Sequence, residues 1–149
     1  MTYPTVLYSS ASDDWRTPDD FFQECVNLFG GFDLDAAASA ENAKAERYFT
    51  VEDNALNRDW DAENVWLNPP YGREMMNWVE KAIKEFESGR SRQIVMLVPS
   101  KTATKWFWRV FEHDKTTTFF IKGRLRFGQA KKSAPFGSVV FVLSHTPVL

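Results

Sequence analysis

The residues with the clearest chemical potential form the tetrapeptide Asn68-Pro69-Pro70-Tyr71. The side-chain amide of Asn68 carries an acceptor oxygen, and Pro69 contributes a backbone carbonyl but no N–H. The second proline, Pro70, restricts the backbone before it to an extended geometry, which holds the two acceptors a short distance apart. We predict that they bind a planar amino group, which has two protons to donate, and that Tyr71 lies against the ring carrying this group.

Two acceptors of this kind can also activate the amine that they bind. An amino group on a nucleobase is a poor nucleophile because its lone pair is delocalised into the ring. Hydrogen bonds accepted from both of its protons favour a pyramidal nitrogen, and bonds that strengthen in the transition state accelerate a reaction. The alternative interpretation is a Pro-Pro turn that ends a strand, with Asn68 capping the next helix. The apolar strand before the motif and the aromatic residue after it favour the chemical interpretation.

Alternating strand and helix signals place the motif in an α/β fold. The predicted strand 65–67 leads directly into it, and ligands of open α/β sheets bind beyond the carboxyl ends of strands. The apolar run 94–98 predicts a central strand buried on both faces. Thr17 is the expected N-cap of the first helix and Pro18 its first residue. The elements expected besides these two strands are helices over 17–29, 41–47, 75–88 and 102–111, and strands over 32–36, 117–121, 124–127 and 138–143, with a tight turn at 122–123.

Length and composition limit the possible classes. A chain of 149 residues predicts a single domain over 1–149, with no separate target-recognition domain because only 22 residues separate Tyr71 from Ile94. One cysteine, Cys25, excludes an intramolecular disulfide, and with two histidines the chain offers no metal-ligand cluster. The sequence contains neither an apolar run of membrane-spanning length nor a secretory signal, so we expect a soluble, intracellular protein without metal or membrane partner.

Charge is distributed unevenly along the chain. Residues 1–63 carry a net charge of −10, residues 64–100 carry +1, and residues 101–132 carry +7. A basic segment on an acidic chain predicts a face for a polyanion, although a solvated charged surface is the alternative. The basic residues singled out as contacts to a phosphate backbone are Lys101, Lys105, Lys122, Arg124, Arg126, Lys131 and Lys132. The aromatic residues among them, Trp106, Phe107, Trp108 and Phe127, are expected mainly in the core.

Beyond the tetrapeptide, a set of motifs resembles the amino-methyltransferases that use S-adenosylmethionine, in particular the small phage and prophage DNA N6-adenine methyltransferases of the Dam type. The resemblance extends from Trp15 to about Phe141, and it implies a Rossmann-like methyltransferase fold with a mostly parallel central sheet, an antiparallel C-terminal hairpin and helices on both faces. Its markers are Trp15-Arg16-Thr17-Pro18, Phe32-Asp33-Leu34-Asp35-Ala36-Ala37, Trp66-Leu67-Asn68-Pro69-Pro70-Tyr71-Gly72, Trp78-Val79-Glu80-Lys81-Ala82, Leu97-Val98-Pro99, Gly123-Arg124-Leu125-Arg126-Phe127 and Ala134-Pro135-Phe136-Gly137-Ser138.

The resemblance implies a role for each matching residue. Asn68 and the Pro69 carbonyl would hold the target amine, and Tyr71 would stack on a base flipped out of the duplex. The residues implied in binding the methyl donor are Trp15, Thr17, Pro18, Asp35, Ala36 and Asp53. The chain departs from many methyltransferases at 36–39, where Ala-Ala-Ala-Ser replaces a glycine-rich turn.

The function that these expectations imply is methylation of the N6 amino group of adenine in double-stranded DNA, with short or relaxed sequence specificity. The protein would act as a monomer or homodimer in the cytoplasm of a bacterial host, encoded by a phage or prophage. Two alternatives remain open at this point. One is methylation of RNA or of a protein glutamine, and the other is a catalytically silent nucleic-acid-binding module of the same fold.

Overall fold

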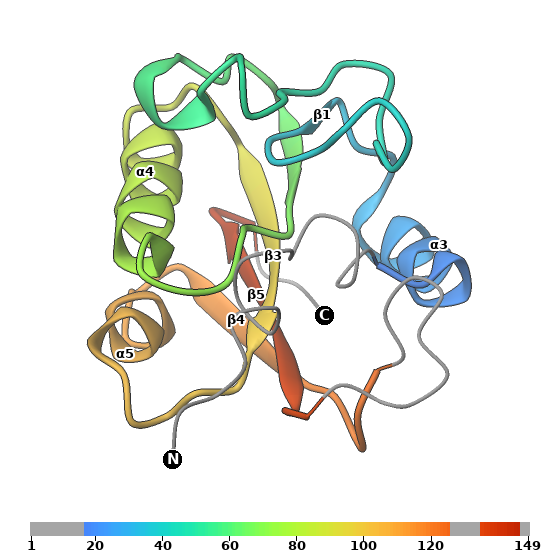
Figure 1. Cartoon of the computed structure of the whole chain (residues 1–149). Helices are drawn as coiled ribbons and strands as arrows, with labels where there is room; N and C mark the ends of the chain where they lie inside the picture. The colour runs from blue at the N-terminus through green and yellow to red at the C-terminus, as the bar shows by residue number, and fades with distance from the viewer. Residues whose placement is uncertain (1–16, 126–134, 147–149) are drawn as a thin grey trace.

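The computed structural model describes residues 17–125 and 135–146. A single mixed sheet with helices on both faces organises the chain (Figure 1). In chain order the elements are α3 (Asp19–Phe29), β1 (Leu34–Asp35), the short 3-10 helix η1 (Ala55–Asn57), β2 (Asn64–Leu67), α4 (Met75–Glu87), β3 (Gln93–Pro99), α5 (Lys105–Phe111), β4 (Thr116–Phe120) and β5 (Ser138–Ser144).

The sheet has five strands in the order β1-β2-β3-β5-β4. Strands β1, β2 and β3 pair in parallel, with Asp35 opposite Trp66 and Leu67 opposite Met96. Strand β5 runs antiparallel to both β3 and β4, so the other four strands share one direction. The predicted mostly parallel sheet with an antiparallel C-terminal pair is confirmed, and β3 is the central strand. The carboxyl ends of β1, β2 and β3 therefore meet at one edge of the sheet.

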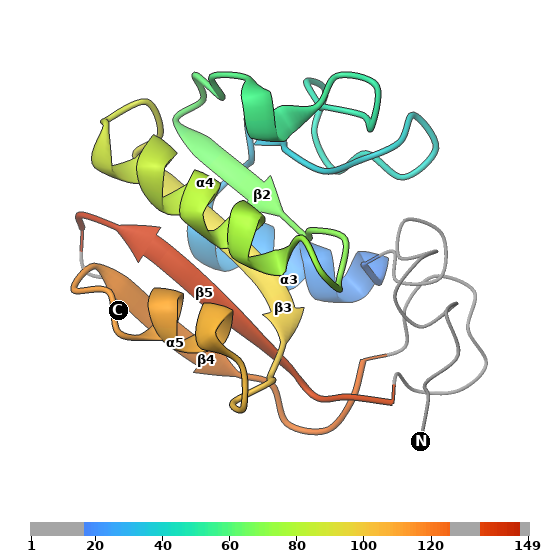
Figure 2. The same cartoon turned by 60° about the vertical axis from the view of Figure 1, so that its left-hand side comes forward.

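Helix α3 covers one face of the sheet, and α4 and α5 cover the other (Figures 1 and 2). Side chains alternate along each strand, so neighbouring residues serve opposite faces. Trp66 of β2 meets Phe22 of α3 edge-on, with ring centroids 5.1 Å apart. On the other face Phe141 of β5 meets Phe107 of α5, with centroids 5.1 Å apart. Aromatic pairs thus anchor the helical layers to both faces of the sheet.

Two of the predicted elements are wrong. Residues 41–47 form turns and bends instead of a helix, because polar side chains bind the backbone there. The Asn42 side chain accepts a hydrogen bond from the Ser39 N–H at 2.8 Å, and Asp35 accepts one from the Lys44 N–H at 2.9 Å. The predicted strand 124–127 is also wrong over its described residues, because 124–125 are irregular and β4 pairs with β5.

The ends of two helices also differ from expectation. Helix α3 begins at Asp19, and Pro18 precedes it with extended backbone and without a side-chain cap, so Thr17 is not the N-cap. Helix α5 begins at Lys105, because Thr104 folds back onto Lys101 through both its N–H and its hydroxyl, at 3.1 and 2.7 Å. The described ranges contain no helix long and apolar enough to cross a membrane.

Candidate active site

A cavity of about 270 Å³ lies at the carboxyl ends of β1 and β2. Four segments build most of its wall: the segment before α3, the end of β1 with the loop after it, η1 with the turn that leads into it, and the Asn68-Pro69-Pro70 segment with the start of α4. Its lining residues are Thr17, Asp35, Ala36, Ala37, Ala38, Asn42, Lys44, Phe49, Thr50, Val51, Asn54, Ala55, Leu56, Trp66, Asn68, Pro69, Pro70, Glu74 and Trp78. The structure therefore brings Asn68, Pro69 and Pro70 of the predicted motif to one cavity with three of the six predicted donor-binding residues, Thr17, Asp35 and Ala36.

The amide of Asn68 is held at both of its polar atoms. Its nitrogen donates a hydrogen bond to the Thr17 hydroxyl at 3.2 Å, and its oxygen accepts one from the Tyr71 hydroxyl at 2.7 Å. Pro69 beside it is buried, and both residues line the cavity. The two residues proposed from the sequence to carry the acceptors therefore follow β2 directly and line the same cavity.

Tyr71, which is predicted to stack on the target base, is buried beside the cavity. Its side chain is 4% exposed, it does not line the cavity, and its ring meets Phe136 edge-on with centroids 5.5 Å apart. Burial raises the pKa of its hydroxyl well above the ordinary value. Its hydroxyl donates a hydrogen bond to the Asn68 side-chain oxygen at 2.7 Å and lies 3.4 Å from the Leu97 carbonyl oxygen.

Asp35 shapes the loop that forms one wall of the cavity. It is 3% exposed, and its carboxylate accepts hydrogen bonds from the N–H groups of Ala37 at 3.3 Å and Lys44 at 2.9 Å. Burial raises its pKa to about 7, although these two hydrogen bonds and the nearby Lys44 charge oppose the shift. No residue of 36–44 has a positive φ, so this loop needs no glycine. The alanines place their small side chains at the cavity instead.

Asp53 lies beside the cavity and is absent from its lining. Its carboxylate accepts hydrogen bonds from the Thr50 N–H at 2.8 Å and the Thr50 hydroxyl at 3.1 Å, which hold its pKa below the ordinary value. This closes the turn that carries Thr50 and Asn54, both of which line the cavity. In this structure Asp53 shapes the cavity wall through Thr50.

Lys44, Phe49 and Trp78 line the cavity although the sequence analysis did not select them. The Lys44 side chain is 12% exposed, and its ammonium forms an ion pair with Asp19 at 3.0 Å. Lys44 is the first lysine in a strongly acidic segment, which is a signal that could have identified it. Phe49 carries no comparable signal, because buried aromatic residues are common in any core. Trp78 belongs to one of the motifs that carry the resemblance, but no role was assigned to it.

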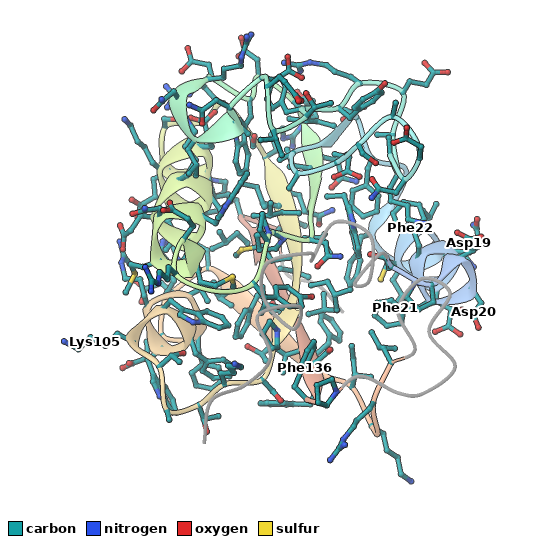
Figure 3. All side chains as sticks on the ribbon, viewed as in Figure 1. Asp19, Asp20, Phe21, Phe22, Lys105 and Phe136 are labelled. Carbon is teal, nitrogen blue, oxygen red and sulfur yellow. The ribbon has the colours of Figure 1, made fainter. Side chains whose placement is uncertain are left out.

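The basic residues predicted to contact a phosphate backbone are spread over several elements. Lys105 points away from α5 into solvent (Figure 3), and Lys122 and Arg124 are exposed after β4. Lys101 is partly buried and follows β3. Lys101 and Lys105 follow the carboxyl end of β3, and Lys122 and Arg124 follow that of β4. Because β3 and β4 run in the same direction as β1 and β2, all four residues belong to the edge of the sheet that carries the cavity. Three of the predicted basic residues lie outside the described residues: Arg126, Lys131 and Lys132. The same holds for Trp15, which is predicted to bind the donor.

Of the interleaved aromatic residues, Trp106 and Phe107 are buried, as expected for the core, and Trp108 is 41% exposed. Phe127 lies outside the described residues. Over 17–125 and 135–146, no three His, Cys, Asp or Glu side chains gather as a possible ligand set for a metal ion.

The strand order and the position of the cavity match a known class of fold. The chain superimposes on the crystal structure of PH1948 from Pyrococcus horikoshii, a protein proposed to be an RNA methyltransferase, with a TM-score of 0.53 and 14% sequence identity. The superposition covers 96% of this chain and 90% of that chain. The fold is therefore the Rossmann-like α/β fold of methyltransferases.

Sequence comparison identifies the family within this class. The chain belongs to the Dam family, described as DNA N-6-adenine-methyltransferase, which it matches over residues 5–144. It is 36% identical to the DNA N-6-adenine-methyltransferase of Escherichia phage T1, over 88% of this chain and 62% of that protein. It is 32% identical to the enzyme of the same name from Haemophilus phage HP1, over 79% of this chain and 68% of that protein. The chain thus spans about 62% of the length of its phage T1 relative.

Proposed function

We propose that this protein methylates the N6 amino group of adenine in DNA, with S-adenosylmethionine as the methyl donor. The observation that carries the proposal is the position of Asn68 and Pro69, which both line the cavity at the shared carboxyl edge of β1 and β2. The two phage relatives named DNA N-6-adenine-methyltransferase support adenine in DNA as the target.

The cavity residues fit S-adenosylmethionine in shape and charge. Ala36, Ala37 and Ala38 allow close approach of a ligand to the backbone, and the side chains of Phe49 and Trp78 offer apolar surface for an adenine ring. The Lys44 ammonium can bind a carboxylate. When bound, S-adenosylmethionine supplies a methyl group attached to a positively charged sulfur. The sulfur, with the rest of the donor molecule, is a good leaving group. The protein therefore needs to supply orientation more than acid–base chemistry.

In the proposed mechanism Asn68 and Pro69 act on the nucleophile. The Asn68 side-chain oxygen and the Pro69 carbonyl would accept hydrogen bonds from the two N–H groups of the adenine amino group, and Pro70 keeps the Pro69 carbonyl in a fixed extended geometry. The nitrogen forms its bond to the methyl carbon as the carbon–sulfur bond breaks, and the cationic methylated amine then releases one proton to solvent. As the nitrogen becomes pyramidal and its charge grows, these hydrogen bonds strengthen. Stabilisation of this kind lowers the barrier because it is greater in the transition state than in the ground state.

Some residues of the proposed donor site line the cavity, and others hold the residues that line it in place. Thr17, Asp35 and Ala36 line the cavity, and Pro18 joins Thr17 to α3. We propose that Asp35 acts mainly by fixing the 36–44 loop, because both of its oxygens bind backbone N–H groups there. The donor role implied for Trp15 and Asp53 remains part of the proposal, with Asp53 acting through the turn at Thr50.

DNA binding is assigned to the basic residues at the same edge of the sheet. Lys101, Lys105, Lys122 and Arg124 would neutralise phosphates, with Arg126, Lys131 and Lys132 as further predicted contacts. Such contacts give affinity without reading sequence, so we propose that the specificity is short or relaxed. The phage origin of two relatives supports a phage or prophage gene whose product acts in the host cytoplasm.

The direct test is incubation of the protein with unmethylated double-stranded DNA and S-adenosylmethionine labelled in its methyl group. Digestion to nucleosides should place the label in N6-methyldeoxyadenosine. Parallel reactions contain single-stranded RNA or a glutamine peptide, and a matched control contains the Asn68→Ala variant. Label in RNA or peptide, with none in DNA, would contradict the proposed substrate.

A further inference from the structure

We propose that Lys44 binds the carboxylate of the methyl donor and selects donors whose amino-acid group is intact. The inference rests on the proposed function, because it concerns the same cavity and takes S-adenosylmethionine as the ligand. It deepens that function by assigning one end of the donor to a residue outside the tetrapeptide and outside the six predicted donor-binding residues.

The position of Lys44 is fixed at its backbone and at its ammonium group. Its backbone N–H donates a hydrogen bond to the buried Asp35 carboxylate at 2.9 Å. Its ammonium nitrogen lies 5.4 Å from the centre of the Phe22 ring and 3.0 Å from a carboxylate oxygen of Asp19, both of which belong to α3 (Figure 3). The side chain therefore reaches from the loop after β1 to the start of α3, and it lines the same cavity as Thr17.

The folded protein compensates this ammonium group poorly for its burial. The Lys44 side chain is 12% exposed, whereas that of its partner Asp19 is 99% exposed. An ion pair with a solvated carboxylate contributes little to stability, and withdrawing an ammonium from water is costly unless it gains strong partners. An ammonium carries three donor protons, so Lys44 can bind a ligand carboxylate in addition to Asp19. A ligand of this kind would supply the compensation.

The other charges of the cavity wall favour the same assignment. Asp35, Lys44 and Glu74 are the charged side chains among the described lining residues. Asp35 and Glu74 repel a carboxylate when they are ionised, and both Asp35 oxygens already accept backbone N–H groups. Phe49 and Trp78 offer apolar surface, which suits the adenosine part of the donor. Over the described part of the wall, Lys44 is therefore the side chain that can neutralise a ligand carboxylate.

This role predicts which ligands the cavity prefers. S-adenosylmethionine and its product S-adenosylhomocysteine both carry the carboxylate. Decarboxylated S-adenosylmethionine lacks it but retains the adenosine, the positively charged sulfur and the amino group. A hydrogen bond between two charged groups is among the stronger ones in proteins. We therefore expect the wild type to bind S-adenosylmethionine at least tenfold more tightly than the decarboxylated form.

The test is calorimetric titration of the protein with these three ligands in the absence of DNA. Lys44→Met keeps the apolar stem and loses the charge. It should lower the affinity for S-adenosylmethionine and S-adenosylhomocysteine at least tenfold, without lowering that for the decarboxylated form. Lys44→Arg keeps the charge and should restore most of the affinity. The matched control is Lys84→Met on α4, which removes one exposed positive charge and should bind all three ligands as the wild type does.

Two results would overturn the inference. One is equal affinity of the wild type for S-adenosylmethionine and its decarboxylated form. The other is an equal loss of affinity for all three ligands in Lys44→Met, which would mean that Lys44 shapes the loop and does not touch the carboxylate. Urea unfolding gives an independent readout, because the free energy of unfolding should not fall in Lys44→Met if the ion pair with Asp19 contributes little. Should Lys44→Met fail to fold, Lys44→Gln takes its place.

Failure of the proposed function would look different. A wild type that binds none of the three ligands would contradict the proposed donor, and the role of Lys44 with it. A wild type that binds S-adenosylmethionine but does not methylate DNA would contradict the proposed target alone, and the binding data would still decide the role of Lys44.

Discussion

Replacing Asp35 tests the link between a buried carboxylate and the donor site. The Asp35→Ala variant removes the acceptor of two backbone hydrogen bonds, from Ala37 at 3.3 Å and Lys44 at 2.9 Å. These bonds fix the loop that contributes Ala36, Ala37 and Ala38 to the cavity wall. We expect affinity for S-adenosylmethionine to fall at least tenfold, which corresponds to about 1.4 kcal/mol or more.

The effect of Asp35→Ala on stability should depend on pH. Burial raises the pKa of Asp35 from 3.8 to about 7, so the ionised form is disfavoured in the fold by an amount of the order of 4 kcal/mol. The native state therefore binds more protons than the unfolded state between these values, and the stability that Asp35 contributes is fully present below pH 4 and is lost as pH rises through about 7. The loss on substitution should be larger at pH 5 than at pH 8.

Two measurements check these expectations for Asp35. Calorimetric titration with S-adenosylmethionine gives the donor affinity, and urea unfolding at pH 5 and pH 8 gives the free energy of unfolding. Asp33→Ala is the matched control, because Asp33 is exposed on the same segment. Equal donor affinity in wild type and Asp35→Ala would refute the role of the loop. A loss of stability that is independent of pH would refute the raised pKa.

Two further predictions concern the buried Glu85 and the basic residues Arg124 and Arg126. Glu85 is fully buried. Burial alone would raise its pKa, but hydrogen bonds from Arg90, Trp60 and Lys81 outweigh that effect and hold the pKa below the ordinary value. Glu85→Gln should therefore lower the free energy of unfolding at pH 7, measured by urea titration, by about 3 kcal/mol, whereas Glu63→Gln, in an exposed ion pair, should lower it by less than about 1 kcal/mol. Replacing Arg124 and Arg126 together with Ala should reduce the slope of log affinity for DNA against log salt by roughly two, as measured by fluorescence anisotropy; an unchanged slope would mean that these arginines do not contact phosphates.

The elements with a strong periodic signal were predictable from the sequence. The apolar run 94–98 is the central strand β3, and the predicted helix over 75–88 is α4. The strand before Asn68 ends where expected, so the motif falls at the carboxyl edge of the sheet. These features depend on local sequence, which determines strand and helix periodicity directly.

The wrong helix over 41–47 has its physical cause in a side chain that binds the backbone at a distance along the chain. The 41–47 segment contains good helix formers, but Asp35 takes the N–H of Lys44 nine residues away. Tyr71 follows Asn68 closely in sequence, yet its ring turns into the core and its hydroxyl turns back to Asn68. A motif gives the residue types at a site, whereas the direction of each side chain depends on tertiary packing, which the sequence analysis did not include.

The central claim is that Asn68 supplies one of two acceptors that activate the adenine amino group. It is tested most directly by single-turnover methylation with the Asn68→Ala variant at saturating DNA and donor. By analogy with the loss of a transition-state hydrogen bond, we predict a rate about 10²- to 10³-fold below that of the wild type, with donor affinity and DNA affinity nearly unchanged. A wild-type rate under these conditions would contradict the claim and reduce the Asn68-Pro69-Pro70-Tyr71 segment to a turn that ends β2.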